Sequence, residues 1–429
     1  MRVRLASLAA AVAVLAALAA GCGGGEDAVR IGVLTDCQGP FHAYEDAQLS
    51  GAELPFLRRG ARLVGPGPSA GVTGLRIAGR RVELVRGCQE SGEHTVFIEE
   101  TRRLIETEHV DAIVGGASVV SRELAHHYPD VPFVNAFWDE QEVTLRSPAH
   151  NLFRFSPDFA QDAAGLGAYA YRQLGWRRAA IVAGDQSAGW DGAAAFTAEF
   201  CSLGGSVVAT SYATPITSSS DVVGRALSRR PDGVAAFLTP FEDQPRLVGT
   251  LLSRLRSPRR LVTWSQSIEA GLPTALGPRL NGIVATTWLP PTPSAALRKY
   301  HSLYHAAYPG LPAWYGDQSW VLSYYDAAEA VLTALGRVGG GEVRAGLIEE
   351  LGRLDLDLPG GRVTLDRNRQ AVRDGYLARV DWARGPSHLQ PVAVVPHTEQ
   401  TFGGLLSAAP PPSRDSQPCV KARPPAWAR

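Results

Sequence analysis

The sequence predicts an α/β protein made of two lobes, each built around a parallel sheet. Three observations predict this fold class. Short apolar runs typical of strands alternate with longer helical stretches along most of the chain. The alternation completes one series and then restarts in a second series of similar size. The length of 429 residues exceeds one ordinary core and fits two or three domains of roughly 150 residues each.

The first series begins with an apolar run at 29–35, which is typical of a strand covered on both faces. A helix is expected at 44–59, and after a loop rich in Gly and Pro a second strand at 81–85. The series then continues as alternating helices and strands at 95–107, 111–115, 119–128 and 131–135.

The second series follows the segment 152–157, which we interpret as a crossing between the lobes. Helices are expected at 158–174, 191–203, 220–229 and 243–255, and strands at 179–183, 206–210, 233–238, 260–264 and 282–287. Three further helices are expected at 293–308, 316–336 and 342–352. The chain from 408 onward is rich in Pro and Ser, which predicts an irregular tail.

The first residues predict export from the cytoplasm. Two arginines precede an apolar stretch at 5–20 that is too short for a comfortable membrane span and is typical of a signal peptide. This stretch ends in Leu-Ala-Ala-Gly-Cys, which resembles a bacterial lipobox and makes Cys22 the expected lipid attachment site. The alternative is an ordinary signal peptide with an incidental cysteine. We expect 1–21 to be removed and 22–28 to form a flexible tether, which leaves an extracytoplasmic body anchored to the membrane by lipid.

The chain has five cysteines, and assigning Cys22 to lipid leaves four. In an oxidising compartment an even number suggests two disulfides, for which three pairings exist. Cys37 and Cys88 close the first two strands, whose ends lie side by side if the strands are neighbours, so we expect a Cys37–Cys88 bond. Cys201–Cys419 would then pin the tail to the second lobe. The spacing does not match a zinc site.

Sequence patterns for catalysis are weak. The run Gly-Pro-Ser-Ala-Gly around Ser69 matches a nucleophile elbow but lies in a loop, where no strand precedes and no helix follows. Gly165-Leu-Gly167 is only a fragment of a dinucleotide fingerprint. His301 and His305 have a spacing able to bind metal but lack a third ligand. We expect no enzyme, no metal and no cofactor. With 42 Lys and Arg against 42 Asp and Glu, no nucleic-acid partner is indicated.

The order of elements over about 29–385 resembles the branched-chain amino-acid-binding family of ABC-transporter substrate-binding proteins, which have the type I periplasmic-binding-protein fold. The stretch from Gly39 to Ala52, the run Val-Gly-Gly-Ala-Ser that ends at Ser118, and the helix that carries Tyr-Asp-Ala-Ala from Tyr325 carry this resemblance together with the colinear strands. The resemblance implies two Rossmann-like lobes joined by three hinge crossings. Lobe 1 would comprise 29–153 and 288–358, lobe 2 would comprise 154–287 and 359–407, and the tail 408–429 would be pinned to lobe 2.

In such sheets ligands bind beyond the C-terminal ends of the strands. For lobe 1 the resemblance implies a ligand contact from Tyr44 and a hydroxyl from Ser118 that holds a carboxylate. The alternatives are packing at a helix start for Tyr44 and a helix cap for Ser118. Trp138 and Asp139 stand where the family has small and hydroxyl residues, and both are expected to face the ligand.

For lobe 2, the place of the family's stacking Tyr is taken by Gly189, and the neighbouring Trp190 is expected to stack on the ligand, with packing in the hinge as the alternative. Thr239, Phe241 and Gln266 follow later strands and are further expected ligand contacts. Gln266 is neutral near the place where amino-acid binders keep an acid for the ammonium group.

The leading hypothesis is therefore a substrate-binding lipoprotein of an ABC importer. It would act as a monomer that captures a small solute, an amino acid or a related or aromatic organic compound, and delivers it to an ABC permease. A ligand-sensing receptor for a membrane signalling partner is the alternative, and an α/β hydrolase is a third possibility.

Overall fold

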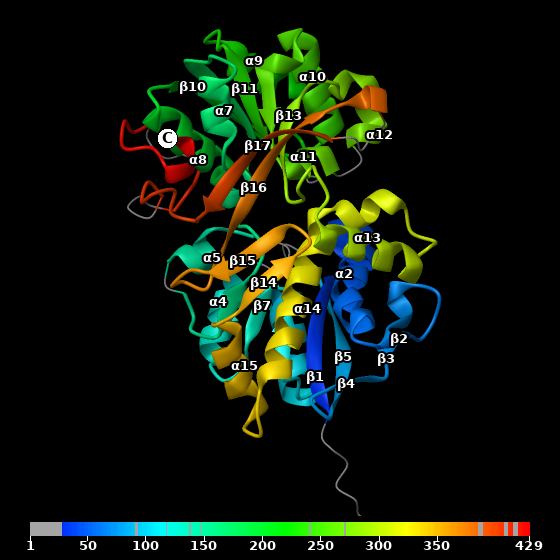
Figure 1. The fold of residues 1–429 in the computed structure, drawn as a ribbon. Coiled ribbons are helices and arrows are strands. Elements are labelled where there is room, and N and C mark those ends of the chain that lie inside the picture. Colours follow the sequence, from blue (N-terminus) through cyan, green and yellow to red (C-terminus); the bar gives the residue numbers. More distant parts are fainter. Residues whose placement is uncertain are drawn as a thin grey trace, which may run out of the picture.

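The computed structural model describes residues 28–90, 93–116, 118–136, 139–146, 148–239, 242–269, 272–384, 389–406, 411–414 and 419–429. Cys22, the expected signal peptide, Trp138 and Phe241 lie outside the described residues. The chain forms two lobes, seen one above the other in Figure 1. In the part of the chain that is described, no helix is both long and apolar enough to cross a membrane.

Lobe 1 is built on a six-stranded sheet of order β4-β5-β1-β6-β7-β8. Neighbouring strands are parallel, except that β4 runs antiparallel to β5. The strands are β1 (Val29–Asp36), β4 (Leu75–Ile77), β5 (Arg80–Gln89), β6 (Ala112–Val114), β7 (Phe133–Asn135) and β8 (Leu152–Arg154), and β2 (Arg62–Leu63) pairs separately with β3 (Val72–Thr73).

Helices from two parts of the chain cover this sheet (Figure 1). The early ones are α2 (Glu45–Arg58), α3 (His94–Arg102), α4 (Ser118–His127) and α5 (Glu142–Leu145), and the late ones are α13 (Ala295–Ala307), α14 (Ser319–Arg337) and α15 (Val343–Leu351). Helices α2 and α14 pack closely because Gly51 has no side chain: a Cβ there would lie 2.2 Å from the carbonyl oxygen of Val321. The late helices therefore pack on the sheet of lobe 1.

Lobe 2 is built on a nine-stranded sheet of order β10-β9-β11-β12-β13-β16-β15-β14, in which β17 also pairs with β16; its last two strands, β15 (Gly361–Leu365) and β14 (Asp355–Leu358), pack on lobe 1. The strands are parallel up to β13, and β16 is antiparallel to both β13 and β17. They are β9 (Arg178–Gly184), β10 (Ser206–Ala213), β11 (Gly233–Phe237), β12 (Leu261–Thr263), β13 (Val284–Thr287), β16 (Ala371–Val380) and β17 (Leu389–Thr398). The covering helices are α6 (Phe159–Asp162), α7 (Leu166–Arg172), α8 (Ser187–Ser202), α9 (Ser219–Leu227), α10 (Gln244–Leu255), α11 (Ser265–Glu269) and α12 (Leu272–Leu276).

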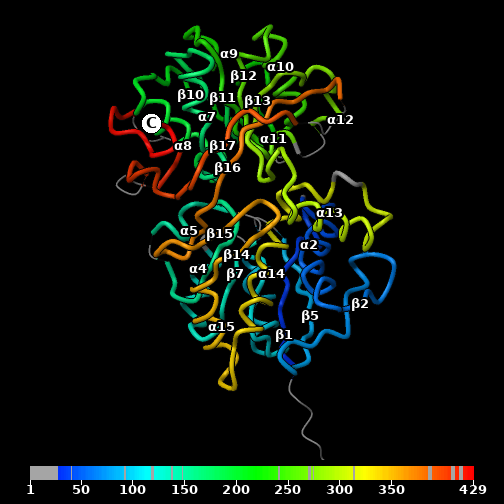
Figure 2. Tube along the Cα trace, viewed as in Figure 1, coloured from blue at the N-terminus to red at the C-terminus, as the bar shows by residue number. Residues whose placement is uncertain are grey.

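The chain crosses between the lobes three times, after β8, after β13 and along β16 (Figure 2). The third crossing lies later than the boundary expected at 358–359. The hairpin of β14 (Asp355–Leu358) and β15 (Gly361–Leu365) packs on lobe 1, because its alternating apolar residues join the core of that lobe; they are Leu356, Leu358 and Val363. The chain enters lobe 2 only beyond Ala371, which still belongs to the core of lobe 1.

The helix expected at 158–174 is two helices, α6 and α7, separated at Gly165. Gly165 has φ +88°, a conformation that breaks the helix, and Glu199 accepts the backbone N–H groups of Gly165 and Gly167 at 3.1 and 2.7 Å. The Gly-Leu-Gly fragment therefore marks the break between two helices, and Glu199 caps the start of the second helix. The strand β17, which the sequence did not predict, packs against Gly165 through Val395.

Both expected disulfides are present. Cys37 and Cys88 join the adjacent ends of β1 and β5, with their Cα atoms 5.3 Å apart. Cys201 of α8 binds Cys419 of the tail, with a Cα–Cα distance of 5.4 Å. The end of the tail is further held by Trp427, whose ring packs edge-on against Phe402 and whose Nε1 donates to Glu199 at 2.8 Å.

Candidate ligand-binding site

The C-terminal ends of the parallel strands in each lobe face the other lobe. The first crossing leaves lobe 1 from the end of β8, and the second leaves lobe 2 from the end of β13. In each sheet the other parallel strands run in the same direction as β8 or β13. Their C-terminal ends therefore lie at the edge from which the crossing leaves (Figure 1). The loops after these strands are where open α/β sheets bind ligands.

An aromatic platform of Phe41, Tyr44 and Trp320 stands at this edge of lobe 1, where Phe41 and Trp320 are buried in the core and Tyr44 is the partly exposed ring. Tyr44 is half-buried and stacks on Trp320, with ring centroids 4.4 Å apart and planes at 15°, and Phe41 lies 6.1 Å from Tyr44. Burial raises the pKa of Tyr44, so its hydroxyl stays protonated at neutral pH. Sequence reasoning found Tyr44 but missed Trp320, which lies in the first turn of α14 far along the chain.

Two glycines after β6 bring the backbone close to this edge. Gly115 and Gly116 have φ values of +102° and +99°, and a Cβ on Gly115 would lie 2.4 Å from the carbonyl oxygen of Leu34. Helix α4 then begins at Ser118, so the N-terminus of this helix lies at the strand ends. The side chain of Ser118 is outside the described part, so its contact with a ligand carboxylate stays a prediction.

Asp139 lies in the hinge. It is 2% exposed, its carboxylate accepts a hydrogen bond from Ser156 Oγ at 3.1 Å, and Arg154 Nε is 3.5 Å away. Burial raises the pKa of Asp139 to about 6, although Arg154 and Ser156 act in the opposite direction. The positive charge of Arg154 also acts on two further buried carboxyls, those of Asp158 and Asp191. This hinge cluster has three carboxyls around Arg154, and burial raises the pKa of all three.

Trp190 of lobe 2 is half-buried, and its Nε1 donates to Asp185 at 3.2 Å. The preceding Gly189 cannot be replaced by a larger residue without moving the strand, since a Cβ there would lie 2.1 Å from the carbonyl oxygen of Gly184. Gly189, which stands at the position of the family tyrosine, is therefore the point of close contact between α8 and β9. Trp190 is the aromatic side chain beside it.

Thr239 and Glu242 form a second polar cluster in lobe 2, after β11. The Thr239 N–H donates to Glu242 at 2.7 Å, and Gln186 Nε2 donates to Thr239 at 2.7 Å and to Glu242 at 2.9 Å. Burial raises the pKa of Glu242. Gln266 is 4% exposed, and its carbonyl oxygen accepts from Gln244 at 3.4 Å. Sequence reasoning missed Glu242, whose only signal was its place three residues after Thr239.

The residues weighed for catalysis do not assemble a catalytic or metal site. Ser69 lies in a short 3-10 turn between β2 and β3, and its carbonyl oxygen accepts from Arg86. His301 pairs with Asp317 at 2.6 Å. Among the described residues, no group of three or more His, Cys, Asp or Glu side chains could hold a metal ion.

Two facing α/β lobes with three crossings, and polar and aromatic residues at the facing strand ends, define a solute-binding protein of the type I class. The family model described as "Periplasmic binding protein" matches residues 28–386, so the chain belongs to that family. Its members are extracytoplasmic substrate-binding proteins of transport systems and not enzymes. No curated protein matches the sequence.

Solved structures agree with this fold. An ABC-transporter substrate-binding protein from Sphaerobacter thermophilus is 23% identical with a TM-score of 0.76, over 87% of this chain and 99% of that one. A solute-binding protein from Rhodopseudomonas palustris HaA2, in complex with p-hydroxybenzoic acid, is 19% identical with a TM-score of 0.74, over 87% and 98%. A leucine-binding protein from Thermotoga maritima is 22% identical with a TM-score of 0.68, over 86% and 99%.

Proposed function

We propose that this protein is the lipid-anchored receptor of an ABC importer, that it works as a monomer, and that its solute is an aromatic carboxylate. The observation that carries the choice of solute is Tyr44, the partly exposed ring of the platform after β1, which the buried rings of Trp320 and Phe41 hold in place. Ring stacking adds about 0.5–1.5 kcal/mol to the burial of an aromatic group. The adjacent N-terminus of α4 is the positive end of the helix dipole, which favours a carboxylate.

The carboxylates near the facing strand ends support this choice over an α-amino acid. An ammonium group needs an anionic partner when it is taken out of water. Asp139 is already engaged by Arg154 and Ser156, and Glu242 by Thr239 and Gln186. Gln266 is neutral. The relative from Rhodopseudomonas palustris was solved with p-hydroxybenzoic acid, which matches the class of solute proposed, whereas another relative is named for leucine.

Isothermal titration of the purified mature protein with 4-hydroxybenzoate, benzoate and leucine tests the proposal. We expect a benzoate to bind and leucine to bind at least tenfold more weakly. Tyr44→Ala should weaken benzoate binding by about tenfold, because it removes one stacking partner. Tyr128→Ala is the matched control, since Tyr128 follows the C-terminal end of α4, away from the facing strand ends, and its hydroxyl donates to Glu106. Preference for leucine, or equal affinities of the two variants, would contradict the proposal.

A further inference from the structure

The polar cluster after β9 and β11 presents a hydrogen-bond acceptor at the facing strand ends of lobe 2. Gln186 follows β9 at the start of α8, while Thr239 and Glu242 follow β11, the strand that pairs with β9. Thr239 and Glu242 are both 3% exposed, whereas Gln186 is half-buried. Gln186 is therefore the member of this cluster that a solute can contact.

The hydrogen bonds of this cluster fix the orientation of the Gln186 amide. Its Nε2 donates to Thr239 Oγ1 at 2.7 Å and to Glu242 Oε1 at 2.9 Å, which uses both hydrogens of the amide NH2 group. The Thr239 hydroxyl donates its own hydrogen to Glu242 Oε2 at 3.2 Å, so its oxygen accepts from Gln186. The opposite orientation of the amide would set its oxygen against the Glu242 carboxylate.

The Glu242 carboxylate can hold the amide because it is itself fixed. It also accepts from the backbone N–H of Thr239 at 2.7 Å. It lies across the end of β9, where Gly184 leaves room for it, since a Cβ on Gly184 would collide with the carboxylate. With both N–H groups of Gln186 in use, Oε1 is the remaining polar atom of its side chain, and within the described residues it accepts no hydrogen bond.

A neutral acceptor selects a solute group that donates a hydrogen bond without carrying a charge. A carboxylate would set oxygen against the oxygen of Gln186. An ammonium group donates, but out of water it needs an anion. Glu242 is engaged by its three donors, and Asp185 accepts from Trp190 Nε1 at 3.2 Å and pairs with Arg414 at 3.3 Å. On an aromatic carboxylate, the neutral donor that fits Gln186 is a phenolic hydroxyl.

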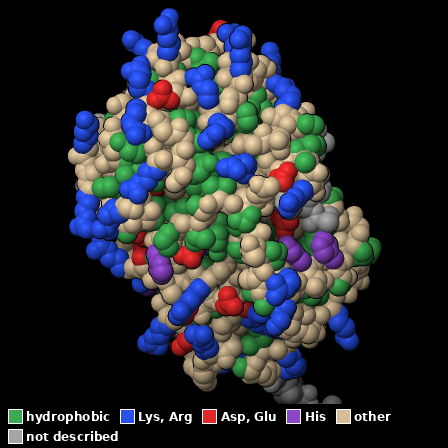
Figure 3. Space-filling view, turned by 45° about the horizontal axis from the view of Figure 1, so that its top comes forward, with side chains coloured by type: hydrophobic (Ala, Val, Ile, Leu, Met, Phe, Trp, Pro, Cys, Tyr) green, Lys and Arg blue, Asp and Glu red, His purple; other side chains and the backbone are tan. Residues whose placement is uncertain are grey.

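The charge of lobe 2 favours an anionic solute over a cationic one. From residue 244 to 287 the sequence contains six arginines and a single acid, Glu269. Figure 3 shows Lys and Arg side chains outnumbering Asp and Glu over the upper part of the visible face. Positive charge of this kind attracts anions and repels cations as they approach. A solute that is an anion and also carries a neutral donor therefore fits both the charge of the lobe and the acceptor at Gln186.

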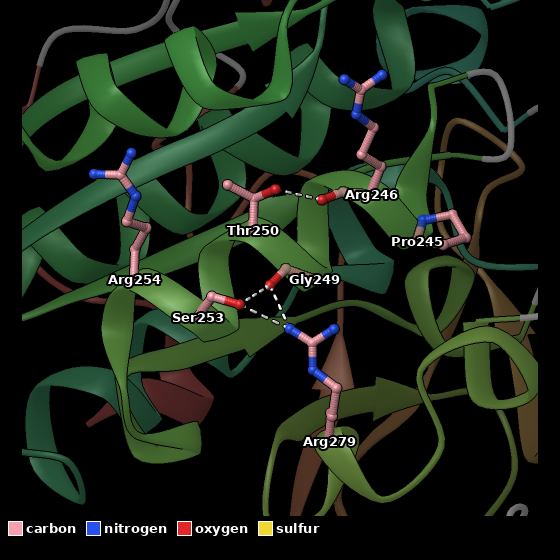
Figure 4. Close-up of a pocket in the computed structure, with 7 residues that line it drawn as sticks. All are labelled: Pro245, Arg246, Gly249, Thr250, Ser253, Arg254 and Arg279. Carbon is pink, nitrogen blue, oxygen red and sulfur yellow. Dashed lines mark hydrogen bonds between the residues drawn. The ribbon is translucent and has the colours of Figure 1, made fainter.

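The hollow of about 340 Å³ along α10 does not compete for this solute. Figure 4 shows the guanidinium groups of Arg246 and Arg254 at opposite ends of the hollow and directed apart. Arg279 points to the helix between them, where it donates to the carbonyl oxygen of Gly249 at 2.7 Å. Solute sites gather a few polar groups that converge on one ligand, usually among apolar or aromatic side chains. The polar groups of this hollow do not converge, and none of its described lining residues is aromatic.

We propose that Gln186 determines specificity, because its Oε1 accepts a hydrogen bond from a ring hydroxyl, and that the solute is an aromatic carboxylate with this hydroxyl para to the carboxylate. The inference rests on the proposed function, in which lobe 1 holds the ring at Tyr44 and the carboxylate at the N-terminus of α4. Since lobe 2 then holds the hydroxyl, the two groups must lie at opposite ends of the ring, which is the para arrangement.

Isothermal titration of the mature protein with four benzoates tests the inference. The ligands are 4-hydroxybenzoate, benzoate, 4-methoxybenzoate, which keeps the oxygen but lacks the donor, and 2-hydroxybenzoate, whose donor lies beside the carboxylate. Gln186→Met replaces the amide by an apolar side chain of similar length. Gln173→Met is the matched control, since Gln173 is an exposed residue at the C-terminal end of α7, just before β9 begins at the opposite edge of the sheet.

We expect the wild type to bind 4-hydroxybenzoate about tenfold more tightly than the other three ligands. Gln186→Met should remove this preference and leave the affinity for benzoate within about twofold, whereas Gln173→Met should bind like the wild type. Equal wild-type affinities for 4-hydroxybenzoate and 4-methoxybenzoate would overturn the inference even if Gln186→Met does not fold, and so would a preference that survives Gln186→Met. Either result leaves an aromatic carboxylate as the solute, whereas binding of none of the four benzoates would overturn the proposed function as well.

Discussion

Replacing Gly165 by Ala should destabilise lobe 2 through two separable effects. The first is backbone strain, because Gly165 has φ +88°, where an alanine costs about 1 kcal/mol more than glycine. The second is overlap, because the new Cβ would lie 2.4 Å from Cγ2 of Val395, well inside the normal contact distance of about 3.5–4.0 Å. Relieving such overpacking costs about 1–3 kcal/mol. The total of about 2–4 kcal/mol corresponds to a drop of roughly 5–15 °C in the melting temperature of a lobe of this size.

Gly175 provides the matched control. It has φ +72°, but no atom lies within 4 Å of a Cβ built there, so Gly175→Ala introduces the strain without the overlap. We expect it to lower the melting temperature by only about 2–4 °C. Adding Val395→Ala to Gly165→Ala should recover part of the loss, because the overlapping atoms are gone. Circular dichroism at increasing temperature measures all three proteins. Equal drops for the two glycine variants, with no recovery in the double variant, would refute the reasoning.

Two further outcomes are expected. The melting temperature should fall as the pH rises from about 5 to about 8, because burial raises the pKa of Asp139 to about 6 and those of Asp158 and Asp162 to about 7. In this pH range the carboxyls of the unfolded chain have already lost the protons that the folded protein still holds. Stability is therefore lost as the pH rises through the pKa values of the folded state. A melting temperature that rises with pH would contradict this. Changing Cys22→Ala should move the protein from the membrane fraction to the soluble extracytoplasmic fraction, as judged by cell fractionation and immunoblotting, and unchanged membrane retention would remove the lipid anchor from the proposal.

The sequence predicted most helices and strands close to their observed positions, because the repeating units bury apolar runs in a regular order. The strands at 29–35 and 179–183, for example, correspond to β1 and β9 with nearly the same bounds. The sequence-based prediction failed where the apolar pattern was interrupted, or where exposed and buried residues alternate. The hairpin of β14 and β15 alternates exposed and buried residues beside a late helix, and its place on lobe 1 depends on contacts with a core formed by distant residues.

The candidate site was predicted less completely than the fold. The family resemblance singled out Tyr44, and its position after a strand singled out Thr239. Both residues lie at the facing strand ends, and their contacts with a ligand stay predictions. Neither signal could show that Asp139 is engaged by Arg154, because that contact depends on how the first crossing folds back on the loop after β7. Trp320 was missed because it opens a helix whose apolar pattern is explained by core packing alone.

The hinge is held by polar contacts, and neither of the two disulfides described above restrains it. Cys37–Cys88 lies within lobe 1 and Cys201–Cys419 within lobe 2, so neither of these two bonds ties one lobe to the other. The crossings are held instead by buried side-chain amides. Gln370 donates to the carbonyl oxygen of Ser156 at 2.9 Å and to Gln161 at 2.8 Å, and thereby joins the first crossing to the third. Each such bond contributes about 1 kcal/mol net, whereas the carboxyls near them lose protons in the neutral range. These amide bonds are weak singly and lie beside carboxyls that change protonation in the neutral range, which suits a clamp that must open and close around its solute.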